Sequence, residues 1–404
     1  MQSMCTKMRP ESKNKTLGLF HTICKIVYVC CGINFWFENM TYPAKLMKIY
    51  SVISKVLEVS VIALLISDFG AFYTQTNLTD KQSADRLLFA IAHPIIYFVY
   101  VSVGYYKQEF RDLVKTLALV LKDMFNDEWI EKLLFRSTFR YLTALGFVCC
   151  STLFSYGVEN GISALMSNAT FTTVIPVWPN VEERSPAAGA IRVVVYIIWW
   201  ILVIRSISVY FVVLTSTIAL THQFKSLCKY FENLNDIFEG SGTQAEKERR
   251  YEDAFKVGIK MHSITLWCAR QIQKVANIAF SAQVIITVGV LFLLMIQMMF
   301  TERTLMAVMP IVSMASCILI GTGVFVWNAG DVTIEAAHLP AAMFHSGWYN
   351  CTRQSSVRVR KLVTIAIAQA QKRVAIKGLG FMELSYEAYV TIVKSSYSLF
   401  SVIY

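Results

Sequence analysis

Residues 191–214 read IRVVVYIIWWILVIRSISVYFVVL, a run in which only Arg192 and Arg205 are charged. As an α-helix this run would be about 36 Å long, because each residue adds ~1.5 Å along the axis. The hydrocarbon core of a bilayer is about 30 Å thick, so a run of this length and composition is typical of a membrane-spanning helix. This stretch therefore indicates an integral membrane protein.

The rest of the chain repeats this pattern. Of its 404 residues, 55% are hydrophobic and 16% are charged, and a soluble domain of this size needs more charge to cover its surface. Six further apolar runs cover residues 46–67, 87–106, 139–158, 276–300, 305–327 and 383–404. We therefore predict an all-α integral membrane protein with seven transmembrane helices, of which the last is the least apolar.

Lys and Arg are distributed unevenly between the two sides. The segment before the first run and the second, fourth and sixth loops carry six, seven, nine and seven of them. The other side holds only Lys81, Arg86, Arg184 and Arg303. Because basic loops stay in the cytoplasm, this predicts a cytoplasmic N-terminus and an extracellular Tyr404. Topology thus accounts for the net charge of +11, and we expect no nucleic-acid partner.

Two features test this orientation. Asn77 and Asn168 open Asn-X-Thr sequons in predicted outer loops and are expected glycosylation sites. None of the ten cysteines lies in an outer loop, so no extracellular disulfide is expected. A G-protein-coupled receptor would have the opposite orientation, and the sequence lacks its Asp-Arg-Tyr-like and Asn-Pro-x-x-Tyr-like motifs.

The predicted organisation has four parts. Residues 1–45 form a cytoplasmic N-terminal segment, 46–327 the first six spans with long inner helical extensions, 328–382 a cytoplasmic anchor region, and 383–404 the seventh span. The inner extensions, with helical patterns at 110–126, 221–238, 245–274 and 331–343, are expected to form a bundle where subunits hold each other. Solvated helices without a partner are the alternative.

The last run carries two faces at helical spacing. The polar face consists of Thr391, Lys394, Ser398 and Ser401, and the mostly aromatic face consists of Val393, Tyr397, Phe400 and Tyr404. A lysine and several hydroxyls facing lipid would be costly, so this side is expected to meet water or protein. One interpretation is a pore-lining helix with a hydrophobic gate that blocks ions by dewetting. The other is a helix packed inside a bundle, its hydroxyls bonded to neighbours.

A ligand pocket is expected among the second to fourth spans, which are rich in aromatic residues and contain few acids in their outer halves. The candidate residues are Phe89, His93, Tyr97, Phe147, Cys150, Phe154, Tyr156, Tyr196, Trp199 and Trp200. Such a cavity would suit a small, neutral, apolar ligand with one or two hydrogen-bonding atoms. For any single residue, ordinary packing in the helix interior is the alternative.

Catalytic motifs are absent from the sequence. It contains no His-Glu-x-x-His, no Gly-rich phosphate loop and no Gly-x-Ser-x-Gly, so neither an enzyme nor a cofactor is expected. Asp331, Glu335 and His338 share a helical face, which we interpret as a solvated face rather than a metal site.

Charged residues inside the spans need partners. Arg205 is either a functional residue or a member of a structural ion pair. Lys55 and Glu58, three residues apart on the first span, are expected to neutralise each other.

The C-terminal region resembles the signature of insect odorant receptors. The resemblance rests on residues 342–349 (AMFHSGWY), 370–373 (AQKR), 380–389 (GFMELSYEAY) and 394–400 (KSSYSLF), with echoes at 175–179 (IPVWP) and 222–224 (HQF). It covers the whole chain in length and topology, although its specific motifs lie mainly in the last seventy or so residues.

This resemblance implies a ligand-specific subunit of an odorant-gated, non-selective cation channel. Such channels are heterotetramers with the co-receptor Orco in the plasma membrane of sensory dendrites, with the seventh helices around a pore. Phe400 and Tyr404 would lie at the gate, and odorants would bind in the outer half of helices two, three, four and six. The chain lacks the co-receptor's long insertion in the fourth loop. We therefore expect a tuning subunit. The aromatic candidate residues and the absence of buried acids favour a small aromatic or heteroaromatic volatile as its ligand. A gustatory receptor of the same superfamily is the alternative, and the signature in the last helix favours the odorant branch.

Overall fold

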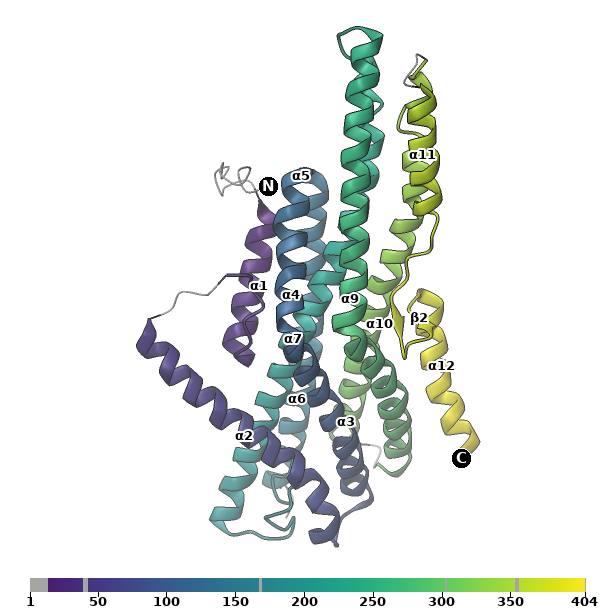
Figure 1. Ribbon diagram of the computed structural model, residues 1–404. Coiled ribbons are helices and arrows are strands. Elements are labelled where there is room, and N and C mark those ends of the chain that lie inside the picture. Colours follow the sequence, from purple (N-terminus) through teal and green to yellow (C-terminus); the bar gives the residue numbers. More distant parts are fainter. Residues whose placement is uncertain (1–13, 39–42, 167–168, 302–303, 353–355, 404) are drawn as a thin grey trace.

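The computed structural model describes residues 14–38, 43–166, 169–301, 304–352 and 356–403, nearly all of them helical (Figure 1). Six of its helices are long and apolar enough to cross a membrane. They are α2 (Ala44–Thr74), α3 (Asp80–Tyr105), α6 (Glu128–Met166), α7 (Pro186–Asn233), α9 (Gln244–Phe300) and α10 (Leu305–Phe344). Each contains one of the first six predicted runs, so the all-α membrane fold class is confirmed.

The remaining elements are shorter. They are α1 (Lys15–Cys31), α4 (Lys107–Lys115), the π-helix η2 (Thr116–Val120), α5 (Leu121–Met124), α8 (Asp236–Glu239), the 3-10 helix η3 (Trp348–Asn350), α11 (Ser356–Ala370), α12 (Tyr386–Ile403) and the strands β1 (Lys377–Gly378) and β2 (Met382–Glu383). The two strands form an antiparallel hairpin just before α12.

Local sequence signals set where the long helices begin. Thr79 and Gln82 form a capping box at the start of α3, and the Ser185 hydroxyl accepts the amide N–H of Ala188 at the start of α7. At α9 the cap is Thr243, whose side chain accepts an amide of the first turn. Each cap satisfies N–H groups that have no partner within the helix, and therefore fixes the residue at which the chain enters it.

The two longest helices of the described chain far exceed the thickness of a bilayer. At ~1.5 Å per residue, the 48 residues of α7 and the 57 residues of α9 reach well beyond the span. Figure 1 shows α9 and α11 projecting together at one end of the molecule. There Phe231, Phe255, Leu339 and Val363 belong to one buried cluster built by α7, α9, α10 and α11. The four helices therefore pack against one another at this end of the molecule.

The seventh predicted run is a helix with a later start. α12 begins at Tyr386 because Glu383 is paired in the hairpin with Lys377. Its 18 residues would extend about 27 Å, and it is not among the six strongly apolar helices of the described chain. Ile392 and Ser396 are buried on its inner side.

One predicted ion pair is wrong. Glu58 binds the guanidinium of Arg205 on α7 instead of Lys55 on its own helix. The Arg205 side chain is nearly fully buried, and a buried charge needs a partner more than the exposed ammonium of Lys55 does. For Arg205, the structure thus supports the ion-pair interpretation, and this pair ties α2 to α7.

Candidate functional site

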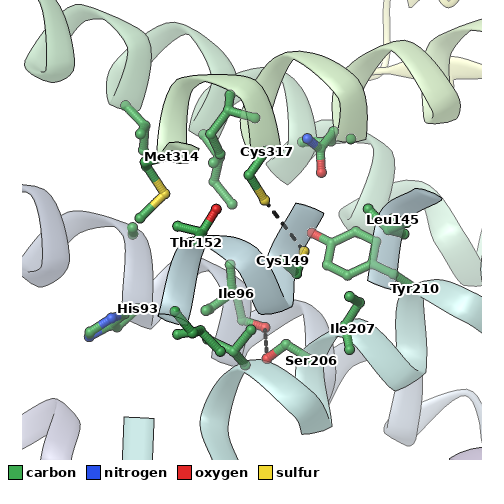
Figure 2. A pocket seen from close by; sticks show the side chains of 18 of the residues that line it. His93, Ile96, Leu145, Cys149, Thr152, Ser206, Ile207, Tyr210, Met314 and Cys317 are labelled. Atoms are coloured by element: carbon green, nitrogen blue, oxygen red, sulfur yellow. Dashed lines mark hydrogen bonds between the residues drawn. The ribbon is translucent and has the colours of Figure 1, made fainter. Parts of the chain in front are cut away.

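A cavity of about 150 Å³ lies between α3, α6, α7, α9 and α10 (Figure 2). Each helix contributes residues three or four apart, which lie on one face of a helix. On α7 these are Trp199, Val203, Ser206 and Tyr210; on α3 they are Phe89, His93 and Ile96. The cavity is thus a meeting point of five helical faces.

Aromatic rings form one wall. Phe89 stacks on His93 with ring centroids 4.9 Å apart and meets the Trp199 ring edge-on at 5.0 Å. Behind them Tyr156 contacts Trp199 edge-on at 5.5 Å. Such pairs hold each ring in a defined orientation, so this wall is preformed.

His93 is oriented by an acid. Its Nδ1 lies 2.7 Å from Oδ2 of Asp68 on α2, and both side chains are almost completely buried. A carboxylate can only accept, so the Nδ1 nitrogen donates this hydrogen bond. In the described part of the chain, Nε2 of His93 has no hydrogen-bond partner.

Tyr210 offers a second unpaired polar group. Its ring packs edge-on against Phe325 at 5.0 Å, and its hydroxyl finds no partner among the described residues. In Figure 2, His93 and Tyr210 lie at opposite ends of the cavity. A buried polar group left unpaired costs about 1–3 kcal/mol, so a bound molecule that satisfies either group gains affinity.

The other polar side chains of the cavity are already engaged. The Thr152 hydroxyl donates to the Ser313 carbonyl at 3.1 Å, and Gln283 donates to the Thr322 hydroxyl at 2.9 Å. Sγ atoms of Cys149 and Cys317 lie 3.4 Å apart. The unpaired polar atoms are therefore those near the two ends.

Size and lining together define the kind of ligand. An apolar cavity of about 150 Å³ in another protein stays dry and admits benzene, so this cavity has room for about one ring. Its walls are mostly hydrocarbon, with hydrogen-bonding atoms at His93 and Tyr210. Such a cavity suits a small neutral molecule, because an ion would lose its hydration without a counter-charge.

Three of the candidate ligand residues, Phe89, His93 and Trp199, line the cavity. Tyr156 lies behind this wall. The Tyr196 hydroxyl donates to the Leu153 carbonyl at 2.9 Å.

The other candidates lie away from the cavity. Trp200 packs against the ring of Tyr196. The Tyr97 hydroxyl donates to Glu58 at 2.6 Å. The side chains of Phe147, Cys150 and Phe154 are exposed on the outside of α6.

Several residues that line the cavity were not predicted from the sequence. They are Cys149, Thr152, Ser206, Tyr210, Gln283, Met314, Cys317 and Phe325, among others. Extending the helical spacing from Trp199 would have reached Ser206 and Tyr210. The contribution of α9 had no local signal, because its inward face is as apolar as its other faces.

On α12, the candidate pore residues lie on the side away from the rest of the chain. Thr391, Lys394, Tyr397, Ser398 and Ser401 are exposed, and Phe400 is half-buried. Tyr404 lies outside the described residues. The Thr391 hydroxyl donates to the Glu387 carbonyl of its own helix, which leaves Lys394 as the polar group with the highest cost in lipid.

The remaining candidates concern glycosylation and metal. Asn77 is exposed in the loop between α2 and α3, while Asn168 lies outside the described residues. No group of three metal-binding side chains occurs in the described part of the chain. Glu335 instead pairs with Lys225 at 3.3 Å, and Asp331 accepts from the Tyr386 hydroxyl at 2.7 Å.

Six long apolar helices, five of which line a small cavity, define a multi-pass membrane protein with a pocket for a small ligand. The sequence model of the family described as 7tm Odorant receptor matches residues 88–397. The chain belongs to this family, as its C-terminal signature predicted.

Comparison with solved structures agrees at the level of the fold. The insect olfactory receptor OR5 from Machilis hrabei, in complex with eugenol, superposes with a TM-score of 0.76 over 96% of this chain and 98% of that chain, at 14% identity. A second structure of the same receptor gives a TM-score of 0.74 at 14% identity, over 96% and 99% of the two chains. No curated protein matches the sequence.

Proposed function

We propose that this odorant receptor is a tuning subunit of an odorant-gated, non-selective cation channel that assembles with the co-receptor Orco in a heterotetramer. The observation that carries the proposal is the exposed polar face of α12, where Thr391, Lys394 and Ser398 lie in a helix that lipid alone would not tolerate. In the assembled channel, this face would contact other subunits and a water-filled pore instead of lipid. Permeant cations would pass along it.

The ligand we propose is a small aromatic or heteroaromatic volatile with one or two hydrogen-bonding atoms. The cavity volume admits about one ring, and Phe89 and Trp199 offer ring faces and edges. His93 Nε2 and the Tyr210 hydroxyl supply the polar contacts. The receptor from Machilis hrabei was solved in complex with eugenol.

Gating follows from contact between the cavity wall and α12. Ile318 of α10 lines the cavity, and the carbonyl of the next residue, Leu319, accepts the Tyr389 hydroxyl of α12 at 3.3 Å. A ligand opens a channel only through higher affinity for the open state. We propose that filling the cavity displaces α10, moves α12 and turns Phe400 away from the pore axis.

The orientation belongs to the same proposal. The basic segments support a cytoplasmic location for the N-terminus and for the anchor region at residues 328–382, and an extracellular end of α12. Asn77 and Asn168 would then face the exterior in the dendrite membrane of a sensory neuron.

The test is to record currents from cells that express this chain with and without the co-receptor during a panel of volatiles. We expect odorant-evoked cation currents only when both are present. Trp199→Ala and His93→Ala should shift the dose-response curve of the best ligand, whereas Phe154→Ala, on the exposed side of α6, serves as the matched control. Curves for the two cavity variants that overlay the wild type would remove the cavity from ligand binding.

A further inference from the structure

A second cavity, of about 410 Å³, lies apart from the first, between the end of α1 and the first half of α2. Tyr28 and Gly32 line it from α1, and Tyr50, Ser51 and Lys55 line it from α2. Gly32 has a φ of 76°, and a Cβ on it would lie 2.9 Å from the Ser54 hydroxyl oxygen. Glycine here ends α1 and keeps this space open.

The cavity is lined by one acid whose charge is already matched. Glu58 binds Arg205 and accepts hydrogen bonds from Tyr97 at 2.6 Å and Tyr100 at 3.3 Å. The ammonium of Lys55 therefore has no acidic partner in the described part of the chain. The lining as a whole offers a free positive charge.

Two further lysines extend this charge along the helices. Lys48 lies seven residues before Lys55, two turns away on the same edge of α2, and Lys25 lies one turn before Tyr28 on α1. All three lysines are exposed. Within the described residues, none of the three lysines takes part in an ion pair.

Apolar surface adjoins the basic edge. Val52, Val56 and Val59 of α2 are exposed to 62%, 59% and 67%. Basic groups at a cavity mouth with an apolar helix surface beside them match the two parts of a phospholipid, an anionic headgroup and its acyl chains. In the orientation proposed above, on which this inference rests, this half of α2 lies in the cytoplasmic leaflet, which carries the anionic lipids.

We propose that this cavity binds the headgroup of an anionic phospholipid of the cytoplasmic leaflet, with Lys55 at the phosphate and Lys25 and Lys48 at the rim. The Tyr28, Tyr50 and Ser51 hydroxyls surround the same space. A lipid held here contacts α2, which the Glu58–Arg205 pair ties to α7 of the odorant cavity.

Native mass spectrometry of the purified full-length chain, titrated with dioleoylphosphatidylserine or dioleoylphosphatidylcholine, tests the proposal. We expect one tightly held phosphatidylserine and no equivalent phosphatidylcholine. Lys55→Gln should weaken phosphatidylserine binding about fivefold, the effect of one basic residue at an anionic membrane surface. Lys132→Gln, an exposed lysine on α6, is the matched control for general charge attraction and should bind as the wild type does.

A second variant separates shape from charge. Ser51→Phe keeps every lysine but fills the cavity, and it should also lose the bound phosphatidylserine. The proposal is overturned if the two lipids bind equally, if Lys55→Gln and Lys132→Gln weaken binding to the same degree, or if Ser51→Phe binds like the wild type. Displacement of the lipid by soluble glycerophosphoserine at equal concentration would overturn the assignment to a membrane lipid in favour of a free phosphate compound.

Discussion

The hydroxyl of Tyr210 gives the sharpest test of the proposed odorant cavity, because its removal should have opposite effects on stability and on ligand binding. In the described chain this buried hydroxyl has no partner. Tyr210→Phe therefore removes an unpaired group and should stabilise the free receptor by up to about 1–3 kcal/mol. The melting temperature of the purified receptor should rise.

The same change should weaken binding of a ligand that accepts a hydrogen bond from Tyr210. One such bond contributes about 0.5–1.5 kcal/mol, which corresponds to a two- to thirteen-fold higher half-maximal concentration, roughly. A hydrocarbon of the same shape makes no such bond, so its dose-response curve should not move. The assay is a pair of dose-response curves under voltage clamp, one for the oxygenated ligand and one for the hydrocarbon.

Tyr196→Phe is the matched control, because its hydroxyl donates to the Leu153 carbonyl and is not used in the cavity lining. This control should leave the preference between the two ligands unchanged. The reasoning is refuted if Tyr210→Phe shifts both ligands equally, or if it lowers the melting temperature, since either result means that the hydroxyl is satisfied inside the protein.

Three further changes probe other parts of the molecule. Glu58→Gln leaves Arg205 as an uncompensated buried charge, which should lower the free energy of unfolding by about 3–5 kcal/mol. Surface labelling should then show most of the variant retained inside the cell. A wild-type surface level would contradict this. Phe400→Ala, co-expressed with the co-receptor, should raise the resting current by widening the gate, and an unchanged leak together with an unchanged odorant response would exclude the residue from the gate. Asn77→Gln should migrate faster on a gel than untreated wild type, because it lacks one glycan, whereas identical migration of untreated wild type and variant would argue against an extracellular position.

Part of the candidate site could be predicted from the sequence. Phe89, His93 and Trp199 were predicted because they lie in spans that are rich in aromatic residues. Phe154 satisfied the same composition rule but lies on the outside of α6. In a membrane helix both lipid-facing and interior sides are apolar, so hydrophobic pattern alone does not separate them.

The ion pair of Glu58 also could not be predicted from local sequence. Spacing on one helix suggested Lys55, but the partner is Arg205, 147 residues away in the sequence. The choice depends on which charge is buried when α2 meets α7, and no local pattern records that. Asp68 and His93 are a second example, since they come from different helices and only the packing of α2 against α3 brings their side chains together.

The sequence by itself determined the class of protein, because lipid requires long apolar helices. The loop charges and the C-terminal signature can likewise be identified from short stretches of consecutive residues. Only the tertiary structure decided which side chains meet: the five helical faces around one cavity, the two unpaired polar atoms within it, and the basic cavity beside α1. Those features arise from packing between residues that are far apart in the chain. Which contact forms there depends on small differences in burial and geometry, which local spacing does not determine.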